Sequence, residues 1–261
     1  MRKKWLVVLL TALIFISVAI LGFATVYRVD SVTVNASVVS EAAEAEAQAL
    51  QTRLTEAYKK EGILFADEEK AQEIIKEFPY FRITAFKKDY PNRLIVSIQE
   101  DAEVYAVAQE NSPNYYILGE DGTVLGIRET YINRLNGEEN VLLKGLVATG
   151  EKGKTLSGDE CIPSMLALCK GLSEGLKGIR KNVVSVEVYS RSPELIYCIT
   201  MREGVRIYVG DPETNSAEKA KMAIDKYLSL SNEEKLTGRI MISDSTGSMV
   251  VVYSPIDDFQ Q

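Results

Sequence analysis

Residues 78–100 read FPYFRITAFKKDYPNRLIVSIQE, and this stretch decides the fold of the first half of the chain. Apolar side chains recur at every second residue, at Phe81, Ile83 and Ala85 and again at Leu94, Val96 and Ile98, so each set lies on one face of a strand. Pro91-Asn92 lies between the two runs, and both residue types favour turns. The stretch therefore predicts a two-stranded hairpin that packs one face on a core.

Two predicted helices lie upstream of this hairpin. One apolar helical face runs over 47–58 and another over 67–78, and Asp67 is suited to be the N-cap of the second helix. Residues 28–34 alternate in the manner of a strand ahead of both helices. The predicted order over 27–100 is therefore strand, helix, helix, strand, strand.

The chain begins with a long apolar run. Residues 5–26 carry no charge, and about 20 apolar residues in a helix are enough to cross a bilayer. The basic cluster at 2–4 then predicts, by the positive-inside rule, that residues 1–4 are cytoplasmic and that the chain after 26 is extracytoplasmic. The alternative is a cleaved signal peptide with its cleavage site near 22–24, although the run is longer than such peptides usually have.

The second half of the chain is rich in predicted strands. The predicted elements are a hairpin over 115–127, a helix over 161–176, a strand over 184–188, a hairpin over 194–209, a helix over 217–230 and a hairpin over 239–253. Residues 136–158 are rich in Gly, Glu and Lys and are predicted to be loop. These elements describe a mostly antiparallel β-domain with flanking helices.

Composition excludes several classes of function. The chain has no histidine, which removes the commonest general base and the commonest metal ligand. Its 37 acidic residues against 30 basic ones argue against nucleic acid as a partner. We expect no enzymatic activity, no cofactor, no metal and no small-molecule substrate.

One motif offers an enzymatic alternative. Ser216 and Lys219 form an S-x-x-K, the spacing that places a serine nucleophile one helical turn from a lysine base in penicillin-binding enzymes. The only Lys-Thr pair, at 154–155, precedes the motif and is not followed by glycine. We therefore interpret Asn215 or Ser216 as the cap of the following helix.

The order of these elements resembles the bacterial cell-division family FtsQ/DivIB. The resemblance rests on residues 78–81, on 90–96 closing at Glu100, on the 116–122 hairpin and on 204–210 with its following helix. Each motif is weak alone, because each is a strand plus a turn, but their order extends over most of the chain. The Glu-Arg-x-Pro that the family has after the 94–100 strand is absent.

The resemblance implies an α+β protein with one N-terminal transmembrane helix. The implied divisions are a cytoplasmic basic tail at 1–4, the transmembrane helix at 5–26, an extracytoplasmic POTRA domain at 27–100, a β-domain at 101–254 and a polar C-terminal tail at 255–261. It further implies a non-catalytic divisome scaffold in the cell membrane at the division septum, with FtsL-like and DivIC/FtsB-like bitopic division proteins as partners. The alternative is another membrane-anchored regulatory or signalling module.

The resemblance also places the partner on the last strand. A partner segment would add a strand to residues 248–253. The implied partner-binding residues are Met249, Val250, Val251, Val252 and Tyr253 on that strand and Lys219, Lys226 and Tyr227 on the neighbouring helix. The alternative interpretation of this apolar strand is a buried central strand.

The cysteines give a first prediction. Cys161 and Cys169 lie eight residues apart on one predicted helix, so their Cα atoms are about 12 Å apart, and a disulfide needs less than about 7 Å. We predict no intrachain disulfide among these two residues and Cys198. Mass spectrometry of alkylated native protein should detect three thiols, and a bridge to Cys198 would contradict the prediction.

Overall fold

A computed structural model describes residues 2–38, 41–59, 61–132, 139–245 and 248–256. The predicted tails therefore lie partly outside the described residues, at 1 and at 257–261. The chain divides into two compact units, Met1–Glu100 and Asp101–Gln261, and the predicted boundary between the domains falls at the same position.

The first unit opens with the helix α1, Arg2–Val26. Within the described part of the chain, no helix is both long enough and apolar enough to cross a membrane. This finding contradicts the predicted transmembrane helix at 5–26 and the predicted single-pass location in the cell membrane.

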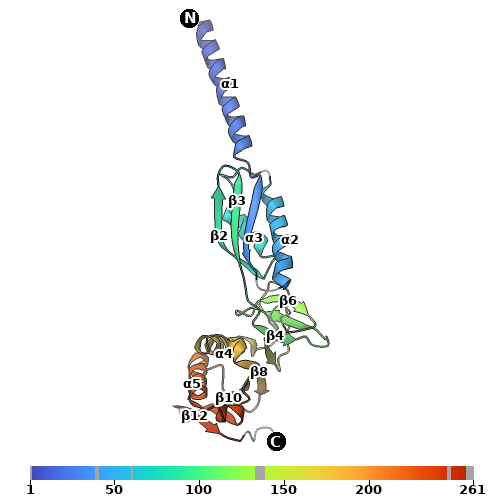
Figure 1. Cartoon of the computed structure of the whole chain (residues 1–261), viewed down its shortest axis with the longest axis vertical. Coiled ribbons are helices and arrows are strands. Elements are labelled where there is room, and N and C mark those ends of the chain that lie inside the picture. Colours follow the sequence, from blue (N-terminus) through green and yellow to red (C-terminus); the bar gives the residue numbers. More distant parts are fainter. Residues whose placement is uncertain (1, 39–40, 60, 133–138, 246–247, 257–261) are drawn as a thin grey trace. The chain divides into compact units, whose positions relative to one another are not determined.

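The rest of the first unit has the predicted order of elements. Its elements are β1 Ser31–Ser37, α2 Glu41–Tyr58, α3 Glu68–Ile75, β2 Phe81–Asp89 and β3 Arg93–Glu100. Figure 1 shows β3 between the two other strands, parallel to β1 and antiparallel to β2. Both helices pack on this three-stranded sheet, and the order of elements predicted from residues 27–100 is confirmed.

Apolar faces of the predicted period form the core of this unit. Leu50 and Leu54 of α2 are fully buried, as are Leu94 and Val96 of β3. The predicted cap is also confirmed, because the Asp67 carboxylate accepts a hydrogen bond of 2.9 Å from the third backbone N–H of α3.

The second unit is one nine-stranded sheet with two α-helices. Its strands are β4 Tyr105–Ala108, β5 Tyr115–Leu118, β6 Val124–Arg128, β7 Val141–Lys144, β8 Val183–Ser190, β9 Ile196–Met201, β10 Arg206–Gly210, β11 Arg239–Ser245 and β12 Ser248–Ser254. Its helices are α4 Ile162–Gly175 and α5 Ser216–Ser229, with the 3₁₀ turns η1 Ile179–Lys181 and η2 Glu234–Leu236. The strand order is β12-β11-β10-β9-β8-β7-β4-β5-β6.

The sheet is mixed, with five antiparallel and three parallel pairings. The prediction of loop throughout 136–158 is wrong, because β7 lies in the centre of the sheet, parallel to both β4 and β8. Only four residues make this strand, too few for the alternation that identifies a strand in sequence. The hairpin predicted over 239–253 is formed by β11 and β12, which pair from Arg239 opposite Ser254 to Ser245 opposite Ser248, and residues 246–247 between them lie outside the described residues.

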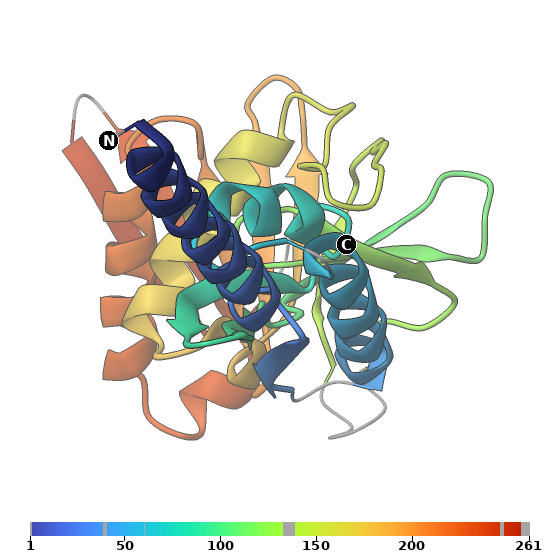
Figure 2. The same ribbon diagram turned by 90° about the horizontal axis from the view of Figure 1, so that it is seen from above.

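The two long helices pack closely against each other. Figure 2 shows α4, in yellow, beside α5, in orange. A Cβ atom at Gly171 would lie 2.7 Å from the Cβ of Ala220, and one at Gly175 would lie 2.3 Å from the Cδ1 of Ile224. Two glycines one turn apart on α4 therefore allow an approach that larger residues would prevent.

A buried ion pair lies at the start of the second unit. The Glu103 side chain is fully buried and accepts two hydrogen bonds, of 2.8 and 2.6 Å, from the guanidinium of Arg128 on β6. Arg180 donates to the backbone oxygen of Glu103 at 2.9 Å. The residues just after the unit boundary are thus tied to β6 and to η1.

Removal of this carboxylate gives a second prediction. Glu103→Gln should lower the free energy of unfolding by about 3 kcal/mol, because it leaves Arg128 without its buried counter-charge. Glu151 forms a solvent-exposed ion pair with Lys154, so Glu151→Gln removes a carboxylate in the same way but should leave stability nearly unchanged. Urea unfolding of the full chain measures both, and equal effects would contradict the assignment.

Candidate functional site

The nine-stranded sheet ends in two edge strands, β6 and β12. An edge strand carries backbone N–H and C=O groups that no neighbouring strand satisfies. Such a row either is covered by other parts of the chain or can receive a strand from another protein.

The β6 edge is partly covered by the chain itself. The N–H of Val124 donates to the oxygen of Lys154 at 2.9 Å, and the N–H of Gly153 donates to the oxygen of Val124 at 2.8 Å. Thr123 and Thr155 form an isolated bridge beside them. The segment at 153–156 therefore occupies the first half of this edge.

The β12 edge has the properties of an open edge. All of the described strand pairing of β12 is with β11, from Arg239 opposite Ser254 to Ser245 opposite Ser248. The strand has no proline and no charged residue, which are the usual protections of an exposed edge. The alternative that 248–253 is a central buried strand is therefore wrong.

The two faces of β12 differ in exposure. Val250 and Val252 point to the outer face and are 39% and 55% exposed, whereas Val251 and Tyr253 pack against the core that includes α5. Met249 follows the same alternation on the inner face. The predicted strand residues thus form an apolar edge with one exposed face and one supported face.

Tyr253 supports the hairpin from its C-terminal end. Its hydroxyl donates to the backbone oxygen of Glu234 at 3.2 Å, and the Nζ of Lys226 lies 6.0 Å from the centre of its ring. Burial, with the nearby Glu234 carboxylate, raises the pKa of this hydroxyl. Since the ring helps to hold β12 in place, a change at Tyr253 would alter the hairpin as well as any surface for a partner.

Lys219 lies in the interior of the second unit. Its side chain is fully buried, and its ammonium donates to the oxygen of Gly210 at 3.0 Å, to the oxygen of Asp211 at 2.6 Å and to the Asp244 carboxylate at 2.7 Å. A side chain in this position does not reach a partner on the surface, which corrects the interpretation of Lys219 as a partner-binding residue. The hydroxyl of Ser216 donates instead to the oxygen of Pro212, so the S-x-x-K pair holds a loop.

Tyr227 is also mostly buried, at 4% exposure. Its hydroxyl donates to the Glu203 carboxylate at 2.5 Å, and the Nζ of Lys235 lies 4.7 Å from its ring centre. Burial and this carboxylate raise the pKa of Tyr227. Of the three predicted helix residues, Lys226 alone is partly exposed beside β12.

Sequence reasoning missed Asp244, which ties the hairpin to Lys219. Asp244 follows the strand run 239–243 and reads as a turn residue. Nothing local to either residue signals an ion pair between positions 25 apart. The one available signal was Lys219 itself, because it occupies the buried face of an otherwise regular amphipathic helix.

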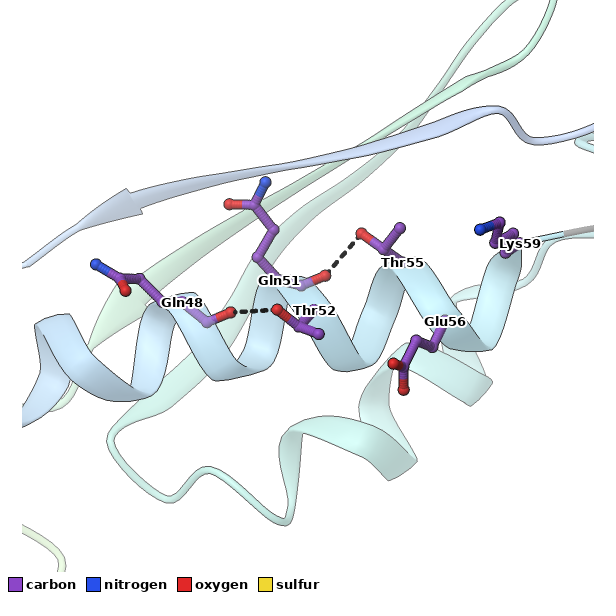
Figure 3. A pocket seen from close by; sticks show the side chains of 6 residues that line it. All are labelled: Gln48, Gln51, Thr52, Thr55, Glu56 and Lys59. Atoms are coloured by element: carbon purple, nitrogen blue, oxygen red, sulfur yellow. Dashed lines mark hydrogen bonds between the residues drawn. The ribbon is translucent and has the colours of Figure 1, made fainter.

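A polar groove of about 400 Å³ lies along α2 in the first unit. Figure 3 shows its lining, which comes from α2 and the residue that follows it: Gln48, Gln51, Thr52, Thr55, Glu56 and Lys59. Both threonine hydroxyls donate to the helix's own carbonyl oxygens, at 3.0 and 2.7 Å. The groove thus offers two amides, two threonine side chains engaged with the helix, and one charged group of each sign. No group of potential metal ligands occurs among the described residues.

Comparison with protein-family models gave no match, and comparison with curated proteins gave none either.

The two edges give a third prediction. In the free full-length protein, the amide of Val124 should exchange slowly with solvent, because it donates to Lys154. Alternate amides of β12 should exchange at close to the rate of an unstructured peptide, because they face the open edge. Hydrogen exchange followed by NMR measures both sites, and uniform protection along β12 would show that its edge is covered.

Proposed function

We propose that this chain is a non-catalytic scaffold of the FtsQ/DivIB type that binds partner division proteins through the free edge of β12. The partners are FtsL-like and DivIC/FtsB-like proteins, and the complex would help to assemble or regulate septal wall synthesis. The observation that carries the proposal is the contrast between the covered β6 edge and the open, uncharged β12 edge of the same sheet.

The proposed contact has a plausible strength. The backbone N–H and C=O groups of alternate residues among the seven in β12 point away from β11. Each hydrogen bond from these groups to an added strand contributes roughly 1 kcal/mol net. Association costs several kcal/mol in lost freedom, so the backbone alone gives weak binding. Val250 and Val252 add apolar area on the outer face, at about 25 cal/mol per Å² buried. A complementary apolar strand on the partner therefore suits this edge.

The engagement of the S-x-x-K groups supports a scaffold over an enzyme. A catalytic serine needs its hydroxyl within hydrogen-bond reach of its base. Here the Ser216 hydroxyl donates to Pro212, and the Lys219 ammonium already donates to three other acceptors. Together these bonds favour a structural role for both residues.

Val252→Asp tests the proposal. The side chain is 55% exposed, so the substitution should leave the melting temperature nearly constant. A carboxylate on the outer face of the added sheet should weaken binding of the DivIC/FtsB-like protein at least tenfold, since a charge would be desolvated there without a partner. Isothermal titration with the full-length proteins measures the affinity.

Val147→Asp is the matched control. Val147 is 58% exposed in a loop before the α4 helix, so the same chemical change occurs away from β12. Its affinity for the partner should equal that of the natural chain. Equal binding by the Val252 and Val147 variants would contradict the placement of the site on β12, and no binding by the natural chain would contradict the proposed function.

A further inference from the structure

The buried Lys219 is an unusual choice of residue for its position. It lies in the first turn of α5, where the helix dipole disfavours a cation, and its side chain is fully buried. Replacing a buried ion pair by apolar residues of similar volume is often neutral or stabilising. Stability alone therefore does not account for a lysine at this site.

A lysine here does one thing that an apolar residue cannot do. Its ammonium joins three segments, because it donates to the end of β10 at Gly210, to the following turn at Asp211 and to the end of β11 at Asp244. Three directed hydrogen bonds fix the relative positions of these segments, whereas apolar contacts tolerate sliding.

Asp244, to which Lys219 donates, lies on β11 opposite the start of the free edge strand β12. Asp244 pairs with Met249 in the register of the β11–β12 hairpin, one residue after β12 begins. At the other end of β12, the hydroxyl of Tyr253 donates to Glu234. Polar contacts therefore lie near both ends of the edge strand: the Lys219–Asp244 ion pair opposite Met249, and the Tyr253 hydrogen bond at the other end.

We propose that Lys219 is a positioning residue for partner docking. Through Asp244, which pairs with Met249, it holds the first residues of β12 in the conformation that an added strand can pair with. Asp244 lies directly opposite Met249 in the β11–β12 register, so the position of this part of the edge follows the position of Asp244. Docking and the ion pair then stabilise each other reciprocally. This inference rests on the proposed function.

Lys219→Met and Asp244→Asn test it, each alone and combined in the full-length chain. Either change removes the charge pair, so amide exchange over 248–254 should rise about tenfold while exchange over β9 stays constant. Affinity for the DivIC/FtsB-like protein should fall about tenfold in each single variant. The double variant should fall no further than either single variant, because both changes break one interaction.

Lys221→Met is the matched control, as an exposed lysine half a turn away on the same helix. It should leave hairpin exchange and partner affinity unchanged. Should Lys219→Met unfold the chain, the half-exposed Asp244→Asn carries the test by itself.

The outcomes separate the two proposals. Unchanged affinity in Asp244→Asn, with or without faster hairpin exchange, overturns the positioning role while the docking edge stands. No binding by the natural chain overturns the docking edge and, with it, the role of Lys219 in docking. The inference is supported if Lys219→Met and Asp244→Asn both show faster amide exchange and weaker partner binding, and Lys221→Met shows neither.

Discussion

An open β-sheet must end in two strands whose outer backbone groups have no strand to pair with, and the second unit of this protein treats its two ends differently. The chain covers the start of β6 with its own segment at 153–156, through hydrogen bonds to both backbone groups of Val124. Within the described part of the chain β12 pairs with β11 alone, and the strand contains neither a charge nor a proline. An apolar edge left open in this way is an aggregation risk unless a partner covers it, which is why the contrast between the edges favours a binding function.

The open edge must also be ordered before binding, because a partner strand can pair only with a strand whose backbone is in the extended conformation. The hairpin that carries it is at the end of the sheet and of the described chain, with only one neighbouring strand. Its inner face packs on the core, Tyr253 holds its C-terminal end, and the buried ammonium of Lys219 holds Asp244, which pairs with Met249 near the start of β12. Burying a lysine is costly, and our proposal explains that cost by the position of β12 that the residue secures, more than by overall stability.

Local patterns in the sequence predicted the local structure well. Alternation and turn residues identified the hairpins β2–β3, β5–β6 and β11–β12, and Asp67 was correctly predicted to be a cap. The failures were of longer range. The strand β7 is too short to show a period, Lys219 and Tyr227 were predicted to bind a partner although the interior encloses them, and the Asp244 contact depends on the pairing of β10 with β11. The apolar run at 5–26 predicted a helix, which α1 confirms, and a membrane span, which the described residues contradict.

The central claim is that a partner adds a strand to β12. NMR spectroscopy of the full-length chain bound to an isotopically labelled DivIC/FtsB-like protein tests it most directly, through cross-strand nuclear Overhauser effects between the two chains. The account predicts a continuous ladder of backbone contacts from Met249 to Tyr253 and none along β6. A complex whose backbone contacts fall on β6, on β1 or on helices alone, with β12 unpaired, would contradict it.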